Sequence, residues 1–345
     1  MLLVLGLMAL IWGVGYALGL PVRGRLAGVG AVWLGVMALH LGLADGHKLR
    51  LATGGRAEVW LVLAGVAGLA LGYRRLVGGL RQPHQGVGLV EETGAFGAAE
   101  LERYARHIAL REIGGAGQRR LKEAKVLVVG AGGLGAPALL YLAGAGVGVI
   151  GVIDHDVVES SNLQRQIIHT DQSIGQPKVR SAMVAMKALN PFIEVKPYAR
   201  RLEADIAFSL IADYDLVLDA SDSFETRELV NRACVAQGKP LISGAITQWE
   251  GQLSLYHPAA GGPCYACVFP ARPAPGLVPT CAEAGVAAPL PGVLGSMMAL
   301  EAIKHLTSAG GTLRGRVVVY DGLNFVVRVV AARRRKDCPV CGAGG

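Results

Sequence analysis

The longest apolar stretches of the chain lie within its first 81 residues. Residues 2–20 and 26–43 contain no charged side chain, and residues 59–73 form a shorter apolar run that ends beside two arginines. A helix that crosses the hydrocarbon core of a bilayer needs about 20 apolar residues. The pattern therefore predicts two or three transmembrane helices, with the third run reaching about residue 80 if its arginines extend toward the membrane surface.

The pattern changes after residue 98. Short β-branched runs at residues 125–129, 149–153 and 216–219 are typical of buried strands, and residues 134–145 and 225–237 are typical of helices. Strands that alternate with helices predict an α/β fold, here a Rossmann-like, mostly parallel sheet with flanking helices.

Three regions follow from these patterns. Residues 1–81 are predicted to be a membrane anchor, and residues 99–345 an α/β domain. Between them, residues 82–98 mix Pro, Gly and Gln without a clear period, which is typical of a linker.

A glycine-rich turn, residues 130–135 (GAGGLG), follows the first predicted strand directly. Its glycines allow a tight turn and let backbone N–H groups approach phosphate oxygens at the start of a helix; they are Gly130, Gly132, Gly133 and Gly135. Asp154 ends the next strand, where this fold usually binds ribose hydroxyls. These features alone are equally compatible with an NAD-dependent dehydrogenase.

The block at residues 161–166 (SNLQRQ) makes the prediction more specific. Asn162, Arg165 and Gln166 offer several N–H donors, and Lys178 lies in the first turn of a predicted helix. A cation at that end of a helix is unfavourable unless an anion lies nearby. Together these side chains resemble a clamp for a triphosphate, which argues against hydride transfer.

The third predicted strand ends at Asp219, and Asp222 follows three residues later. The carboxyl ends of parallel strands are the edge at which α/β sheets bind ligands. Asp222 is therefore a candidate ligand of a Mg²⁺ ion that bridges phosphates.

Four of the six cysteines form two C-x-x-C pairs, Cys264 with Cys267 and Cys338 with Cys341. Two such pairs supply the four thiolates of a tetrahedral Zn²⁺ site even when they are distant in sequence, and a disulfide is the weaker alternative in a reducing compartment. The sequence therefore predicts a structural zinc site.

The net charge is +8, and 8 basic against 4 acidic residues lie in the first 98 positions, which leaves 26 against 22 for the rest. The second region is only mildly basic, so its charge does not indicate nucleic-acid binding.

The ordered motifs from about residue 101 to residue 341 resemble the MoeB/ThiF/HesA family, bacterial relatives of ubiquitin-activating enzymes, and within it the MoeB branch. They are the RYAR sequence that ends at Arg106, the glycine turn, the DHD sequence from Asp154, the SNLQRQ block, the QPK sequence that ends at Lys178, the LDASD sequence that ends at Asp222, and the paired C-x-x-C motifs.

The resemblance implies an enzyme that uses MgATP to adenylate the C-terminal Gly–Gly carboxylate of a ubiquitin-like sulfur-carrier protein, in molybdopterin or thiamine-type biosynthesis. It implies that Asp154 binds the ribose, that Asn162, Arg165 and Lys178 contact the phosphates with Gln166 nearby, and that Asp222 holds Mg²⁺. Arg106 is implied to reach the ATP site of the partner subunit in a homodimer. A sulfurtransferase or cysteine desulfurase is the expected sulfur donor.

Other functions stay open at this point. The chain is alternatively a membrane-bound scaffold that binds nucleotide or carrier without turnover, or a relative that activates a tRNA base or small molecule. Some relatives use a cysteine near Cys281 for a covalent link to the carrier, so that residue has either a catalytic or a purely structural role.

Because adenylation needs cytosolic ATP, we expect the second region to be cytoplasmic and the protein to be a multi-pass protein of the inner membrane. Three helices would then place five basic residues inside, Arg23, Arg25, Arg74, Arg75 and Arg81, against three outside, Lys48, Arg50 and Arg56.

Overall fold

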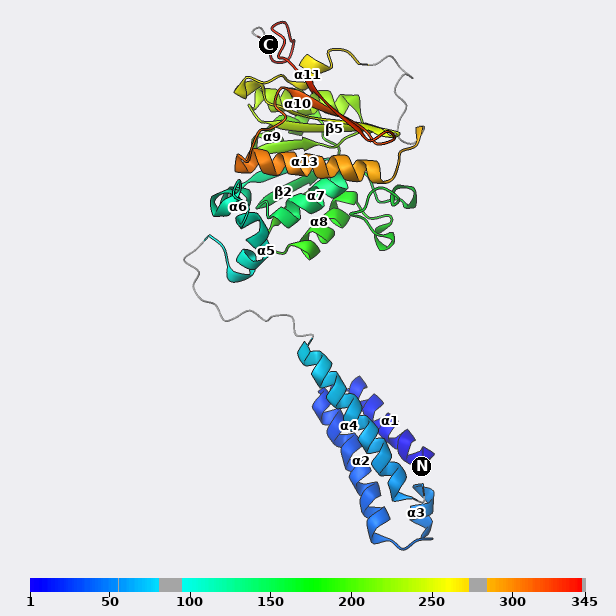
Figure 1. The fold of residues 1–345 in the computed structure, drawn as a ribbon. Helices are drawn as coiled ribbons and strands as arrows, with labels where there is room; N and C mark the ends of the chain where they lie inside the picture. Colours follow the sequence, from blue (N-terminus) through cyan, green and yellow to red (C-terminus); the bar gives the residue numbers. More distant parts are fainter. Residues whose placement is uncertain (55, 81–94, 273–283, 343–345) are drawn as a thin grey trace. The chain divides into compact units, whose positions relative to one another are not determined.

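The computed structural model describes the chain except for residues 55, 81–94, 273–283 and 343–345 (Figure 1). The chain divides into two compact units, Met1–Glu91 and Glu92–Gly345. Most of the predicted linker, residues 82–94, and Cys281 lie outside the described residues. Ala98, predicted as the last linker residue, is the first residue of a helix.

The first unit is a bundle of three long helices and one short helix (Figure 1), and these are α1 (Leu2–Ala17), α2 (Val22–Gly42), α3 (Lys48–Ala52) and α4 (Ala57–Leu80). A small cluster of Val4, Val36 and Trp60 forms its interior. The amino group of Met1 donates to the carbonyl of Ala52, which places the N-terminus at the same end as α3. The turn between α1 and α2 and the end of α4 therefore lie at the opposite end.

Most apolar side chains of this unit point outward. Leu3, Leu34 and Leu69 are between 62% and 83% exposed. One helix of the described chain, at Gly24–Gly42, is long and apolar enough to cross a membrane by length and composition. The apolar helix α1 has 16 residues, fewer than the 19-residue run 2–20 suggested, because the helix ends at Ala17.

The second unit is built on one eight-stranded sheet in the order β3-β2-β1-β4-β5-β6-β7-β8. The pairs from β3 to β5 are parallel and those from β5 to β8 are antiparallel. The strands are β1 (Lys125–Val129), β2 (Val149–Ile153), β3 (Glu194–Tyr198), β4 (Leu216–Asp219), β5 (Leu241–Thr247), β6 (Glu250–Tyr256), β7 (Arg316–Asp321) and β8 (Val326–Ala331).

Helices cover both faces of this sheet, and they are α5 (Ala98–Ile108), α6 (Gly114–Glu123), α7 (Gly135–Ala145), α8 (Lys178–Leu189), α9 (Ala204–Ala212), α10 (Phe224–Ala236), α11 (Tyr265–Val268) and α13 (Pro289–Thr307). Alternate residues of β1 point to opposite faces, as the two-residue period of a strand requires. Val126 and Val128 pack with α7, α8 and α13, whereas Leu127 and Val129 pack with α9 and α10.

The predicted α/β fold and the bounds of β1, β2 and β4 agree with the structure. Two helix predictions differ by one residue at their ends, since α7 begins at Gly135 and α10 covers Phe224–Ala236. Four of the seven strand pairings are parallel, so the sheet is mostly parallel as predicted, and its antiparallel pairings are confined to β5–β8.

Candidate active site

The glycine turn between β1 and α7 is shaped by close backbone packing. Gly130 has a φ of +97°, and a Cβ atom there would lie 2.9 Å from the carbonyl oxygen of Ala220. A Cβ atom at Gly135 would lie 2.0 Å from the carbonyl oxygen of Gly130. Gly130, Gly132 and Gly133 line a large cleft, whereas Gly135 does not and is required for the packing of the turn against the helix.

Asp154 fastens this turn to the end of β2. One carboxylate oxygen accepts a hydrogen bond from the N–H of Ala131, and the other accepts one from the N–H of Asp156, both at 2.8 Å. The carbonyl of Ala131 is 2.9 Å from Nε2 of His169, which is buried. An ionised carboxylate has about four acceptor positions, so Asp154 retains capacity to accept hydroxyl groups from a ligand in the cleft.

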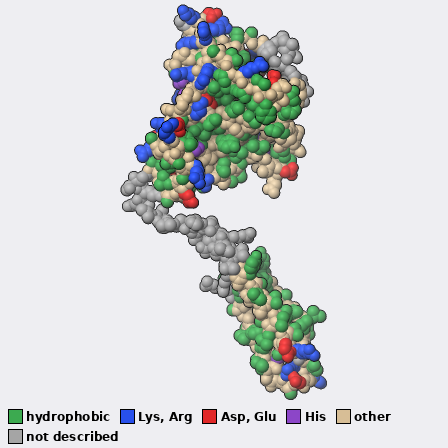
Figure 2. All heavy atoms as spheres, viewed as in Figure 1, with side chains coloured by type: hydrophobic (Ala, Val, Ile, Leu, Met, Phe, Trp, Pro, Cys, Tyr) green, Lys and Arg blue, Asp and Glu red, His purple; other side chains and the backbone are tan. Residues whose placement is uncertain are grey.

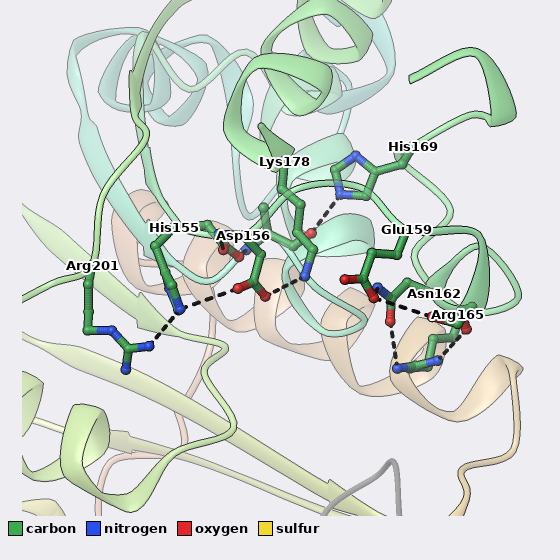
Figure 3. Close-up of polar contacts among 11 residues, drawn as sticks. His155, Asp156, Glu159, Asn162, Arg165, His169, Lys178 and Arg201 are labelled. Atoms are coloured by element: carbon green, nitrogen blue, oxygen red, sulfur yellow. Dashed lines mark hydrogen bonds and ion pairs between the residues drawn. The ribbon is translucent and has the colours of Figure 1, made fainter. Parts of the chain in front are cut away.

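Lys178 is the first residue of α8, and its ammonium group forms an ion pair at 2.8 Å with the Asp156 carboxylate (Figure 3). Burial alone would raise the pKa of Asp156, but the hydrogen bond and charge of Lys178 outweigh it and lower that pKa. His155 connects this pair to Arg201. The sequence identified Lys178 but missed Asp156, although the acidic residues two apart at 154 and 156 were the available signal.

Arg165 is held at the cleft by the loop that precedes it (Figure 3). Its guanidinium donates to the carbonyl of Ser161 and to the side-chain oxygen of Asn162, at 3.2 and 3.1 Å. Asn162 in turn donates to Glu159 and does not line the cleft itself. In this structure Asn162 therefore supports Arg165.

Gln166 is 4% exposed and lines the cleft, and its Oε1 atom has no hydrogen-bond partner among the described residues. A buried amide oxygen without a donor is costly, which is consistent with a polar ligand beside it.

The two aspartates after β4 have different surroundings. Asp219 is fully buried and accepts hydrogen bonds from Arg227 at 3.2 Å and from Ser243 at 3.0 Å. Asp222 is exposed, lines the cleft and has no hydrogen bond or ion pair within the described part of the chain. Of these two aspartates, Asp222 is the one whose carboxylate has no partner among the described residues, and its role as a Mg²⁺ ligand stays a prediction.

The cleft has a volume of about 1000 Å³ and lies at the carboxyl ends of the parallel strands. It brings together most of the predicted nucleotide-binding residues, namely Gly130, Gly132, Gly133, Asp154, Arg165, Gln166, Lys178 and Asp222. This volume and this edge of the sheet are typical of a nucleotide site in α/β proteins.

Comparison with known proteins identifies the family of the chain. The chain matches the ThiF family over residues 104–340, which is more than half of its length. The chain belongs to the ThiF family. The resemblance seen in the sequence motifs is therefore confirmed at the level of the family.

Two relatives match most of the second unit, Glu92–Gly345, which is called the ThiF unit below. A protein named sulfur carrier protein adenylyltransferase, from Thermus thermophilus, is 50% identical over 247 residues, which are 70% of this chain and 91% of that protein. A protein named SAMP-activating enzyme E1, from Haloferax volcanii, is 48% identical over 248 residues, 72% of this chain and 91% of that protein. A crystal structure of E. coli MccB with AMPCPP and MccA has the same fold, with a TM-score of 0.61, 24% identity, and coverage of 70% of this chain and 74% of that one.

Arg106 is not brought to the cleft within one ThiF unit. It is exposed in the last turn of α5 and makes no hydrogen bond or ion pair within the described residues. A role in its own chain's site is therefore not supported by its position, and a role in a partner's site stays a prediction.

The four predicted zinc ligands do come together in the ThiF unit. The sulfur of Cys264 lies 3.8 Å from that of Cys267 and 3.6 Å from that of Cys338, and the sulfurs of Cys267 and Cys341 are 3.4 Å apart. Tetrahedral Zn²⁺ with four thiolates places sulfurs about 3.8 Å apart, given Zn–S bonds of about 2.3 Å. All four are free thiols, so the geometry fits a metal and not a pair of disulfides.

The surroundings of the cluster favour a thiolate at one of its cysteines, Cys338. The backbone N–H of Arg335 donates to the sulfur of Cys267. Burial raises the pKa of Cys338, but the backbone amides of Val340 and Cys341 outweigh it and lower that pKa to about 7. Burial raises the pKa of Cys264 and Cys341 in the absence of a metal. The described residues thus satisfy the ligand number and spacing that zinc requires, and a bound Zn²⁺ would itself favour the thiolates.

Proposed function

We propose that this protein uses MgATP to adenylate the C-terminal Gly–Gly carboxylate of a ubiquitin-like sulfur-carrier protein. The observation that carries the proposal is the cleft itself, in which Asp154, Arg165, Lys178 and Asp222 surround the glycine turn. The names of two relatives at about half identity, an adenylyltransferase of a sulfur carrier and a SAMP-activating enzyme, support the same reaction.

The reaction needs positioning and charge neutralisation more than acid–base catalysis, because a carboxylate is already ionised at neutral pH. A carboxylate oxygen forms a bond to the α-phosphorus while the bond to pyrophosphate breaks, which leaves an acyl-adenylate. In our proposal Asp154 binds the ribose and Arg165 and Lys178 bind phosphate oxygens, supported by Asn162 and Gln166. Asp222 would hold Mg²⁺, which supplies positive charge to the departing pyrophosphate.

The remaining functions are less well supported. A dehydrogenase is disfavoured because the chain belongs to the ThiF family and its two relatives are named as an adenylyltransferase and an activating enzyme. Activation of a tRNA base is not favoured by the mildly basic charge of the ThiF unit, and the exchange assay below separates a scaffold without turnover from an enzyme. We propose that a separate sulfurtransferase or cysteine desulfurase supplies sulfur to the adenylated carrier, for molybdopterin or thiamine-type products.

Pyrophosphate exchange tests the reaction directly. With MgATP and a Gly–Gly carrier, labelled pyrophosphate should enter ATP, and Asp222→Ala should abolish the exchange by removing the cation ligand. Asp213→Ala, a change of the same type at an exposed residue outside the cleft, should leave it intact. Equal exchange in Asp222→Ala and the unchanged protein would contradict the site, and ATP binding without exchange for every carrier tested would favour the scaffold.

We further propose a homodimer in which Arg106 reaches the partner's ATP. Arg106→Ala and Asp222→Ala should each be inactive alone, yet co-expression should restore part of the activity, because one of the two sites in a mixed dimer keeps both residues. Mixed dimers that form but stay inactive would exclude donation between subunits.

The first unit is proposed to be a multi-pass inner-membrane anchor with the ThiF unit in the cytoplasm. Figure 2 shows apolar side chains over most of the visible face of this unit and charged side chains gathered at one end. The outward leucines of α1, α2 and α4 support lipid contact, because about 2 kcal/mol is gained when each leaves water. Lys48, Arg50 and Arg56 lie at the end proposed to face away from the cytoplasm.

A further inference from the structure

A chain of polar contacts borders the nucleotide cleft and includes two residues with no role in the proposed reaction so far, Asp156 and His155 (Figure 3). The Asp156 carboxylate is 2.8 Å from the Lys178 ammonium. Nε2 of His155 is 2.7 Å from a guanidinium nitrogen of Arg201 and 3.3 Å from the other oxygen of Asp156. All four side chains line the cleft.

The contact between Lys178 and Asp156 is the most consequential of these. The Lys178 side chain is 6% exposed, and within the described residues its ammonium group has no partner other than the Asp156 carboxylate. A buried ammonium without a partner carries a large desolvation cost. The carboxylate therefore keeps a charged lysine at the wall of the cleft.

His155 does not share this role. Because the Arg201 guanidinium can only donate, Nε2 of His155 must accept in their 2.7 Å contact. A nitrogen that accepts there cannot donate to Asp156 at the same time. The carboxylate of Asp156 is thus left to Lys178.

The backbone of Asp156 is hydrogen-bonded to two residues that line the cleft, Asp154 and Lys178. Its N–H donates to Asp154 at 2.8 Å, and its carbonyl accepts from the N–H of Lys178 at 2.9 Å. The next residue, Val157, forms an isolated β-bridge with Pro177. Asp156 is therefore hydrogen-bonded both to Asp154, predicted to bind the ribose, and to Lys178, predicted to bind the phosphates.

We propose that Asp156 is a positioning residue whose carboxylate directs the Lys178 ammonium toward the phosphates of the bound nucleotide. The inference rests on the proposed function for the identity of the ligand. An ammonium group has three donors, so Lys178 can keep its bond to Asp156 while it donates to phosphate oxygens.

A double-mutant cycle on ligand binding tests the proposal. Asp156→Asn keeps the shape and the two backbone hydrogen bonds but removes the charge. In full-length protein without carrier, Asp156→Asn should weaken MgATP binding about tenfold, in the range of a charge-assisted hydrogen bond. Adenosine, which lacks phosphates, should bind as it does to the unchanged protein, and this also shows that the variant is folded. In the Lys178→Met background, Asp156→Asn should have no further effect on MgATP.

Two further variants sharpen the result. Asp156→Glu, which retains the charge, should recover most of the MgATP affinity. Asp171→Asn, the same change at an exposed residue outside the cleft, should leave it unaltered. MgATP affinity that is equal or higher in Asp156→Asn, or an equal loss in both backgrounds, would overturn this inference alone. If Lys178→Met does not weaken MgATP, the nucleotide site of the proposed function is overturned as well.

Discussion

The two units of this chain arrange the same apolar residue types in opposite ways. In the ThiF unit Leu127, Leu142 and Leu218 are fully buried between the sheet and its helices. In the N-terminal unit Leu3 and Leu34 are 83% and 62% exposed, and only a few residues form an interior. Folding in water drives apolar surface inward, so the outward apolar side chains of the N-terminal unit need a covering, which in our proposal is lipid.

The two units also differ in which candidate functional residues they contain. Every residue that lines the nucleotide cleft belongs to the ThiF unit, as do the four clustered cysteines. In our proposal the N-terminal unit therefore determines where the reaction occurs, and the ThiF unit carries it out.

Removal of the N-terminal unit should have the largest effect and tests whether the two units have the separate roles that we propose. A chain that begins at Gly97 should move completely from the membrane fraction to the soluble fraction and keep its pyrophosphate exchange. The full-length protein should stay with membranes in a high-salt wash, because buried apolar surface and not charge holds it there. A full-length protein that salt releases would show that the first unit does not span a membrane.

The second largest effect is expected at the cysteine cluster. Cys338→Ser should release zinc from the ThiF unit and lower its melting temperature, since binding of a structural metal is coupled to folding. Cys234→Ala is a matched control, because Cys234 is also buried but lies outside the cluster, and it should retain the metal. Metal analysis of freshly reduced protein should find about one zinc ion per chain, and protein that contains no zinc would contradict the site.

The parts of the fold that could be predicted are those where the local pattern decides the structure. β1, β2 and β4 are central parallel strands buried on both faces, so each is a continuous apolar run with clear ends. The antiparallel strands β6 to β8 lack this signal. In β8 the side chains of Val327 and Val329 are more than half exposed, so its pattern does not mark an inward face.

The candidate site could be predicted where its residues follow directly from local sequence patterns, and not where they are brought together by contacts distant in sequence. Residues at strand ends and in the glycine turn have fixed places in the fold, and the cleft contains most of those predicted, namely Gly130, Gly132, Gly133, Asp154 and Asp222. The partner of Lys178 was missed because Asp156 lies 22 residues earlier, and the contact arises only from the pairing of Val157 with Pro177. Similarly, only the structure shows that the Arg227 guanidinium donates to the Asp219 carboxylate, whereas the Asp222 carboxylate has no partner among the described residues.

A pair of leucine substitutions compares the two interiors at a smaller scale. Leu142→Ala in α7 should lower the free energy of unfolding of the ThiF unit by about 2–5 kcal/mol, because it leaves a cavity in a packed core. Leu34→Ala in α2 removes an exposed side chain and should change the stability of its bundle by less than about 0.5 kcal/mol. Denaturant unfolding in detergent, followed separately for each unit, measures both values. Equal losses would mean that Leu34 packs against protein.

The smallest expected effect is a pH dependence of stability that originates in the ThiF unit. His169 is 6% exposed, with Nδ1 at 2.9 Å from Ser181 and Nε2 at 2.9 Å from the carbonyl of Ala131. Burial lowers the pKa of His169 and outweighs the hydrogen bond to Ala131, which acts in the opposite direction. The folded protein thus holds a neutral His169 at pH values where the unfolded chain already binds a proton.

Because the unfolded state binds more protons in that range, the free energy of unfolding should fall as pH decreases from about 6.5 toward the lower pKa of the folded state. Each unit of pKa difference contributes about 1.4 kcal/mol. His169→Gln cannot titrate, so its stability should decline less steeply over this range. Some decline should remain, since burial also lowers the pKa of His257 and His305. Denaturant unfolding between pH 5 and pH 7.5 measures the two slopes, and identical slopes in both proteins would show that His169 is not the group that titrates.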